Sequence, residues 1–132
     1  MIKQIVVTDK APAAVGPYSQ AVRVGNLIYT AGQIGLVPPA KNLAGPDIAS
    51  QTRQVLTNIK AIVEAAGSCM KHVVKTTVFL QDISDWPAMN AVYAEFFAEH
   101  APARSAFQVG ALPMGAKVEI EAVAVVCDCH DH

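Results

Sequence analysis

The final apolar segment, Lys117–Cys127, places the strongest restriction on how this chain folds. Alternate side chains of a strand point to opposite faces of its sheet. The even positions of the segment are all apolar: Val118, Ile120, Ala122, Ala124 and Val126. The odd positions start with Glu119 and Glu121 and continue with Val123 and Val125. Because both faces carry apolar residues, the segment predicts a strand inside a sheet that is covered on both sides.

Two helices are predicted by apolar residues spaced three and four positions apart. The first spans Asp47–Ala66, with Asp47 as its capping residue and Gly67 at its end. The second runs from Ser84 or Asp85 to His100, with Pro87 in its first turn. Its apolar stripe consists of Met89, Val92, Tyr93, Phe96 and Phe97.

The other regular segments are rich in β-branched and aromatic residues and predict strands. They are Ile2–Thr8, Gln20–Val24, Leu27–Gln33, Val73–Leu80 and Ser105–Gly110. The order βββ-α-β-α-ββ predicts a single α+β domain over residues 1–132, with a mixed six-stranded sheet and both helices on one face. Two helices cover only that face, so a partner subunit is the simplest cover for the other. Residues 127–132 are expected to form a flexible tail.

Charge and apolar content exclude several classes of protein. Lys and Arg number 10 against 11 Asp and Glu, which argues against binding to nucleic acid or to an anionic membrane. No apolar run approaches the roughly 20 residues that a transmembrane helix needs. Three cysteines, Cys69, Cys127 and Cys129, do not form a disulfide framework, which indicates a reducing compartment. We expect a cytoplasmic protein, although a mitochondrial form without its transit segment would have the same features.

Most catalytic motifs are missing: there is no nucleophile elbow, phosphate-binding loop, dinucleotide fingerprint or zinc-protease helix. The tail Cys127–His132 has metal-binding residue types, but chain ends are seldom held in place. We interpret it as a solvated tail, with adventitious metal binding as the alternative.

Arg104 lies directly before a predicted strand, among small and apolar residues. Its guanidinium suits a two-point grip on a carboxylate or phosphate, but a structural ion pair with a glutamate fits the spacing as well. Tyr18 is expected half-buried in a turn, and Gly32 lets either a packed neighbour or a ligand approach the backbone.

Several segments together resemble one family over nearly the whole chain. They are Ala11–Ala21, Tyr29–Gly35, Val74–Leu80, Asn90–Tyr93, Pro102–Ser105 and Val118–Ala124. The family is the RidA group of reactive intermediate deaminases, also called YjgF or L-PSP endoribonuclease-like proteins. The resemblance implies a chorismate-mutase-like fold, a homotrimer with ligand clefts between subunits, and hydrolysis of small 2-imino or enamine acids to 2-keto acids and ammonia.

The resemblance also implies roles for particular residues. Arg104 would bind the substrate carboxylate and Glu121 would orient or activate the attacking water, with Glu119 on the same strand face as the alternative base. The pocket would be lined by Tyr18, Gly32, Asn90, Ala106 and Phe107. Ala31 replaces the serine of many active members, which removes one hydroxyl from the site.

The implied chemistry needs no metal and no organic cofactor. Two other function classes stay open beside it. One is an endoribonuclease or translation inhibitor, which the acidic balance and the lack of a histidine pair disfavour. The other is a non-catalytic trimer that binds small carboxylates or acts as a chaperone, which the Ala31 substitution keeps open.

Overall fold

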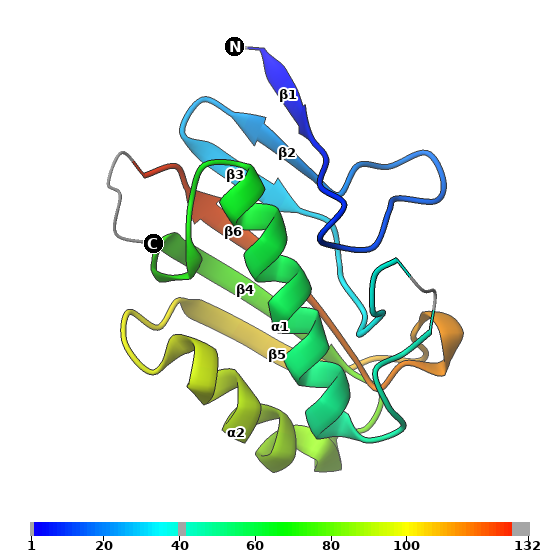
Figure 1. Cartoon of the computed structure of the whole chain (residues 1–132). Coiled ribbons are helices and arrows are strands. Elements are labelled where there is room, and N and C mark those ends of the chain that lie inside the picture. Colours follow the sequence, from blue (N-terminus) through cyan, green and yellow to red (C-terminus); the bar gives the residue numbers. More distant parts are fainter. Residues whose placement is uncertain (1, 40–41, 128–132) are drawn as a thin grey trace.

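The six strands of the protein form one mixed sheet in the order β1-β2-β3-β6-β4-β5 (Figure 1). The computed structural model describes residues 2–39 and 42–127. The strands are β1 (Lys3–Val6), β2 (Ala21–Val24), β3 (Leu27–Thr30), β4 (Val73–Leu80), β5 (Ala103–Gln108) and β6 (Val118–Val125). The helices are α1 (Ile48–Ala65) and α2 (Trp86–Phe97), with 3₁₀ turns η1 (Met70–His72), η2 (Ile83–Asp85) and η3 (Pro113–Gly115). Both helices lie on one face of the sheet, which confirms the predicted fold class.

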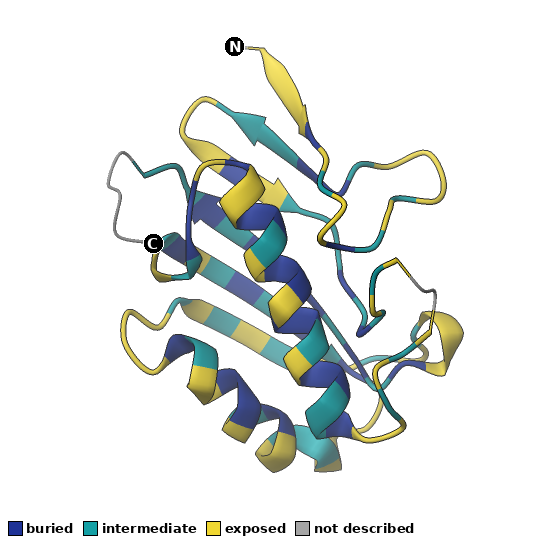
Figure 2. Ribbon diagram, in the orientation of Figure 1, coloured by how far each residue is buried: buried dark blue, intermediate teal, exposed yellow. Residues whose placement is uncertain are grey.

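Helix α1 matches its predicted limits because local signals define both ends. The Asp47 carboxylate accepts a hydrogen bond from the Ser50 backbone N–H at 2.9 Å, as a capping residue does. At the other end Gly67 has a φ of +96°, a left-handed conformation that glycine adopts without strain. The apolar stripe of the helix is fully buried against the sheet (Figure 2).

Helix α2 is shorter than predicted at both ends. Residues Ile83–Asp85 form the 3₁₀ turn η2 instead of the first helical turn, because the Asp82 carboxylate accepts from the Ser84 N–H. The helix ends at Phe97, and His100 follows with a φ of +57°. Proline at the start of α2 occupies its predicted place.

Strands β1 and β3 end before their predicted last residues, because side chains form hydrogen bonds with backbone groups that would otherwise pair between the strands. The buried Gln20 side chain accepts from the Thr8 N–H at 2.8 Å, so β1 stops at Val6 and the pairing does not reach Thr8. At the end of β3, the Thr30 hydroxyl accepts from the Ala122 N–H at 3.0 Å. The chain rejoins β6 only at Gln33, whose backbone pairs with Ile120.

Strand β6 occupies an interior position, as predicted, between β3 and β4. Its even positions Val118–Ala124 are buried beneath the helices, whereas its odd positions are partly or fully exposed. Apolar side chains also reach solvent on that second face, which we call the open face. They include Ile5, Tyr29 and Phe107. The expected covering of this face by a partner stays a prediction.

Cys127 is the first residue of the predicted tail. The Cys127 N–H donates to the Gly67 carbonyl at 3.1 Å, so Cys127 is held against the end of α1. Residues 128–132 lie outside the described part of the chain. Over that described part, neither helix is long and apolar enough to cross a membrane.

Candidate functional site

A cleft of about 440 Å³ lies on the open face beside the start of β6. It contains three polar or backbone features of interest, namely the Tyr18 ring, the Gly32 backbone and the Glu119 carboxyl group. The rest of its wall is largely apolar and includes Pro12, Val15, Leu36 and Met114. An apolar cleft with a few polar groups is the usual form of a small-molecule site.

Gly32 brings the backbone into contact with Glu119. The bridge between Gln33 and Ile120, with N–H to O distances of 2.9 and 3.1 Å, holds the two segments side by side. A Cβ atom at position 32 would overlap Oε2 of Glu119. Glycine at position 32 thus leaves the space that the Glu119 carboxyl group occupies in this conformation.

The surroundings of Glu119 favour its protonated form. Partial burial, followed by the negative charge of Glu121, raises the pKa of the Glu119 carboxyl group above its usual value. A carboxyl with a raised pKa in a cleft is suited to accept and return protons.

Glu121, the residue expected to hold the water, does not lie in this cleft. It is exposed and lines a smaller hollow of about 140 Å³ with Tyr29, Lys75 and Thr77. Two residues along a strand separate it from Glu119, roughly 7 Å on the same face. The structure therefore brings Glu119, and not Glu121, together with Tyr18 and Gly32.

Arg104 is held beneath α2. Its Nη1 donates to Oδ1 of Asn90 at 2.8 Å, and its guanidinium carbon lies 4.6 Å from the ring centre of Tyr93 and 5.1 Å from that of Trp86. The Tyr93 hydroxyl is itself fixed by Thr76 at 2.7 Å. Among the described residues no carboxylate lies within ion-pair distance of Arg104, so the ion-pair alternative is not what the structure contains. The guanidinium keeps N–H groups for an external anion.

The register of the sheet separates Arg104 from the cleft. Arg104 pairs with Thr76 and Ala106 with Val78, both of which point to the helices. Phe107 instead points to the open face, where its ring packs edge-on against Phe79 at 5.4 Å. Arg104 and Glu119 therefore lie on opposite faces of the sheet in one copy of the chain.

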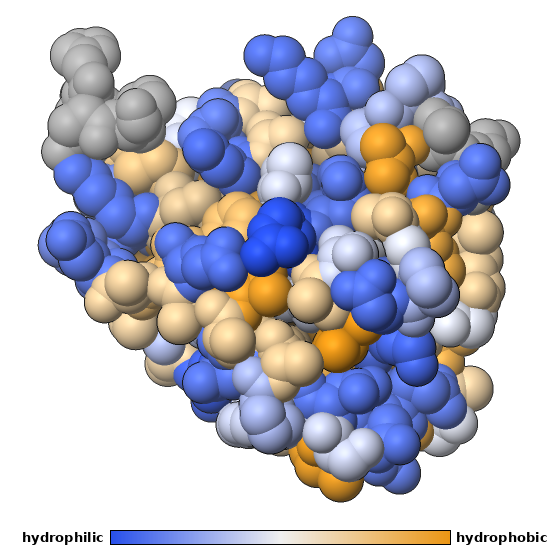
Figure 3. All heavy atoms as spheres, turned by 60° about the horizontal axis from the view of Figure 1, so that its bottom comes forward, coloured by the Kyte–Doolittle hydropathy of each residue, from blue (hydrophilic) through white to orange (hydrophobic). Residues whose placement is uncertain are grey.

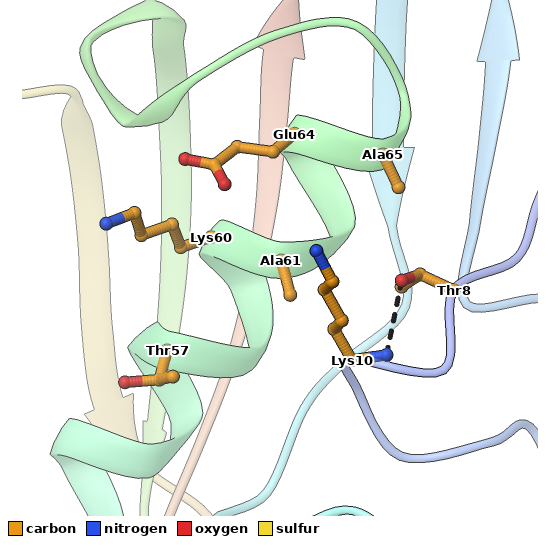
Figure 4. A pocket seen from close by; sticks show the side chains of 7 residues that line it. All are labelled: Thr8, Lys10, Thr57, Lys60, Ala61, Glu64 and Ala65. Atoms are coloured by element: carbon orange, nitrogen blue, oxygen red, sulfur yellow. Dashed lines mark hydrogen bonds between the residues drawn. The ribbon is translucent and has the colours of Figure 1, made fainter.

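Another hollow, of about 480 Å³, lies along the outer side of α1 (Figure 4). Lys10, Lys60 and Glu64 project around it, and none of the predicted site residues reaches it. On the side that Figure 3 brings forward, hydrophilic side chains are interspersed with apolar ones.

Comparison with known proteins gives the chain its family. The family model for Endoribonuclease L-PSP matches residues 8–126. The chain belongs to the L-PSP family. Relatives of this L-PSP protein include the 2-iminobutanoate/2-iminopropanoate deaminases of Bos taurus, at 50% identity, and Homo sapiens, at 47%. Each alignment covers 95% of this chain and 91% of the relative.

Solved L-PSP family structures have the same fold. The YjgF gene product of E. coli superposes with a TM-score of 0.88 at 50% identity, covering 92% of this chain and 98% of that one. The structure of E. coli TdcF with bound serine gives a TM-score of 0.89 at 44% identity, covering 94% and 99%.

Several contributors to the L-PSP cleft were not singled out as site residues in the sequence. Among them, Val15 lies on a loop and Met114 in the turn η3, and no sequence pattern distinguishes these apolar wall residues. Glu119 was named only as the alternative base. The alternation of β6 places both glutamates on one face, and only the pairing of Gln33 with Ile120 selects between them.

Proposed function

We propose that the chain hydrolyses small 2-imino acids, such as 2-iminopropanoate and 2-iminobutanoate, to 2-keto acids and ammonia. The observation that carries the proposal is the cleft in which Glu119, with its raised pKa, faces Tyr18 and Gly32. Relatives at 47–50% identity are named as deaminases of these imines. The serine held by E. coli TdcF has the same small 2-substituted carboxylate form.

The proposed site is shared between two copies of the chain. A substrate of a few atoms cannot contact both Arg104 and Glu119 of one copy, because the sheet lies between them. In a homotrimer each cleft takes Arg104 from one subunit and Glu119 from the next. The uncovered apolar residues of the open face support this assembly, because they would be buried between subunits.

Arg104 supplies orientation. Two parallel N–H groups of its guanidinium bind the substrate carboxylate, which fixes the position and rotation of the imine carbon. Asn90 and the rings of Tyr93 and Trp86 hold the guanidinium in place before substrate arrives. Ala106 lies on the same face of β5 as Arg104, whereas Phe107 lies on the open face with Glu119.

Glu119 supplies proton transfer. Its carboxylate holds a water molecule near the carbon of the protonated imine. It accepts a proton from that water as the oxygen adds to the carbon, and the electron pair of the C=N double bond passes to the nitrogen. The product of this step is a carbinolamine with one hydroxyl and one amino group on the same carbon. Glu119 then gives its proton to the amino nitrogen, the C–N bond breaks and ammonia leaves. The hydroxyl proton returns to the Glu119 carboxylate as the C=O bond of the keto acid forms. Tyr18 lines the cleft, and Gly32 leaves room for the Glu119 carboxyl group.

Mixing two inactive variants tests both the activity and the shared cleft. We expect Arg104→Ala and Glu119→Gln each to lose most hydrolysis of imino acid generated by an amino-acid oxidase. Subunits unfolded and refolded together in equal amounts should recover roughly a quarter of the parental activity, because one cleft in four then joins an intact Arg104 to an intact Glu119.

Refolding each variant alone controls for the procedure and should give no recovery. No recovery in the mixture, with trimers formed, would contradict the shared cleft. Full activity in both single variants would contradict the proposed chemistry itself. Purified RNA incubated with the parent and with Arg104→Ala tests the endoribonuclease alternative, and we expect no cleavage that depends on Arg104.

A further inference from the structure

A cluster of metal-binding side chains lies far from the proposed catalytic cleft. Cys69, His72 and Cys127 each offer one ligand atom, and these three atoms all lie within 4.8 Å of one another. The cluster forms where α1 ends, β4 begins and β6 ends (Figure 1). Glu119 stands at the other end of β6, eight residues from Cys127, which corresponds to roughly 26 Å along a strand.

The backbone holds the three residues in place. Cys69 precedes the 3₁₀ turn η1, and the His72 N–H donates to the Cys69 carbonyl at 3.0 Å, so one turn presents both side chains. Cys127 is tied to the same region by its N–H bond to Gly67. The Ser68 hydroxyl adds a bond of 2.6 Å to the Val125 carbonyl. Hydrogen bonds of the backbone thus hold Cys127 beside the turn that carries Cys69 and His72, although the two segments lie far apart in the sequence.

Two thiols and one imidazole are the donor set that Zn²⁺ prefers. Tetrahedral coordination, with Zn–S near 2.3 Å and Zn–N near 2.0 Å, separates ligand atoms by about 3.5–3.8 Å. The 4.8 Å within which the three ligand atoms lie exceeds this spacing by about 1 Å. Small changes in the side-chain torsion angles can close that difference. Neither cysteine is disulfide-bonded, and the half-buried His72 and Cys127 leave one side open to solvent.

We propose that Cys69, His72 and Cys127 form a zinc site with three protein ligands and a water molecule in the fourth position. Binding releases the two thiol protons, so the two thiolates neutralise the charge of the ion. The ion joins the turn after α1 to the end of β6. The site is separate from the imine chemistry, which the proposed mechanism performs without metal.

Cobalt titration of the full reduced, metal-free chain tests the site. One equivalent of Co²⁺ should produce thiolate charge-transfer bands and the intense visible bands of tetrahedral cobalt, and Zn²⁺ should displace them. Zinc at a hundredfold excess over its dissociation constant should raise the Tm by roughly 5–10 °C. In Cys127→Ser and in His72→Ala, the affinity for cobalt and the affinity for zinc should each fall at least tenfold. Because Cys69 is buried and Cys69→Ser risks misfolding, the two less buried positions carry the test.

The matched control is a chain with Cys129→Ser, His130→Ala and His132→Ala, which removes the potential ligands of the last residues and keeps the cluster. It should bind cobalt like the parent. Loss of the bands in this control, or their persistence in Cys127→Ser, would assign the metal to the tail and overturn the proposal. The absence of one-to-one binding by the reduced parent would overturn it too, as would a Cys69–Cys127 disulfide in a chain that binds no metal after reduction.

Discussion

Two neighbouring glutamates of β6 experience different surroundings. Glu119 is partly buried in the cleft, whereas Glu121 is exposed beside Lys75 and Thr77. We expect Glu119→Gln to lower the turnover of 2-imino acids by about 10²–10⁴-fold, because an amide cannot accept the proton of the attacking water. Steady-state kinetics of the two single amide variants check this, and Glu121→Gln should stay within a few-fold of the parent. A larger loss in Glu121→Gln would reassign the base to the position first expected from the sequence.

The raised pKa of Glu119 also predicts a pH-dependent cost to stability. As the pH rises, the unfolded chain releases this proton first, so the folded state loses stability until the pH passes the folded-state pKa. Glu119→Gln removes that loss. The variant should therefore have a higher Tm than the parent at neutral pH, and the difference should shrink as the pH falls below both pKa values. A Tm difference that does not change with pH would contradict the assignment.

Arg104 has neighbours that suit a planar cation. Arg104→Lys keeps the positive charge but loses the two-pronged geometry and most of the stacking on Tyr93 and Trp86. We expect it to weaken binding of 2-ketobutyrate at least roughly tenfold, because each charge-assisted hydrogen bond contributes about 1.5–3 kcal/mol. Calorimetry on the lysine and alanine variants measures the effect. Parental binding by the lysine variant would show that charge alone is sufficient.

A buried hydrogen bond between the hydroxyl groups of Tyr93 and Thr76 helps to attach helix α2 to the sheet. Tyr93→Phe leaves the Thr76 hydroxyl without this partner in the core, which should cost about 1–3 kcal/mol of unfolding free energy. Arg104 keeps an aromatic ring beneath it, so ligand binding should change little. Denaturant unfolding checks the first expectation. The double variant with Thr76→Val should lose less than the sum of the two single changes.

At the level of elements, the limits that depend on local sequence signals could be predicted, whereas the limits that depend on strand pairing could not. The limits of α1 follow from Asp47 and Gly67, which are visible in the sequence. Strand β5 begins at Ala103 and not at Ser105, because parallel pairing with Lys75 of β4 draws the preceding residues into the ladder. That partner lies 28 positions earlier in the chain, and no property of Ala103 itself indicates it.

The site was predictable by residue type but not by arrangement. The sequence identified Tyr18, Gly32 and Arg104 as candidate site residues. Tyr18 and Gly32 line the cleft, and Arg104 lies against Asn90 of α2. The face to which Arg104 points depends on its register with Thr76, and the choice between Glu119 and Glu121 depends on the bridge at Gln33. Both are long-range pairings, which the alternation of a single strand does not specify.

For the whole molecule, the exposed apolar residues of the open face predict an interface with other copies of the chain, and the resemblance to the RidA group implies that the assembly is a trimer. Light scattering at micromolar concentration should give about three times the chain mass of 13.9 kDa. A charged substitution at the half-exposed Tyr29, such as Tyr29→Asp, should weaken assembly, since it places a charge in the surface to be buried. Thr57→Asp, which places the same charge on the exposed outer side of α1, serves as the control for general misfolding. A parent that stays at the single-chain mass would refute the shared cleft.

The contact between Gly32 and Glu119 limits how the cleft can change through evolution. Any side chain at position 32 displaces the carboxyl group, and any shorter residue at position 119 leaves space that a side chain at position 32 can fill. A lineage that loses this glycine therefore has to move the carboxyl group to another place in the cleft, away from the backbone of residue 32. Changes in the apolar wall, at positions such as Val15 and Met114, offer a route to new substrate preferences that does not involve this contact.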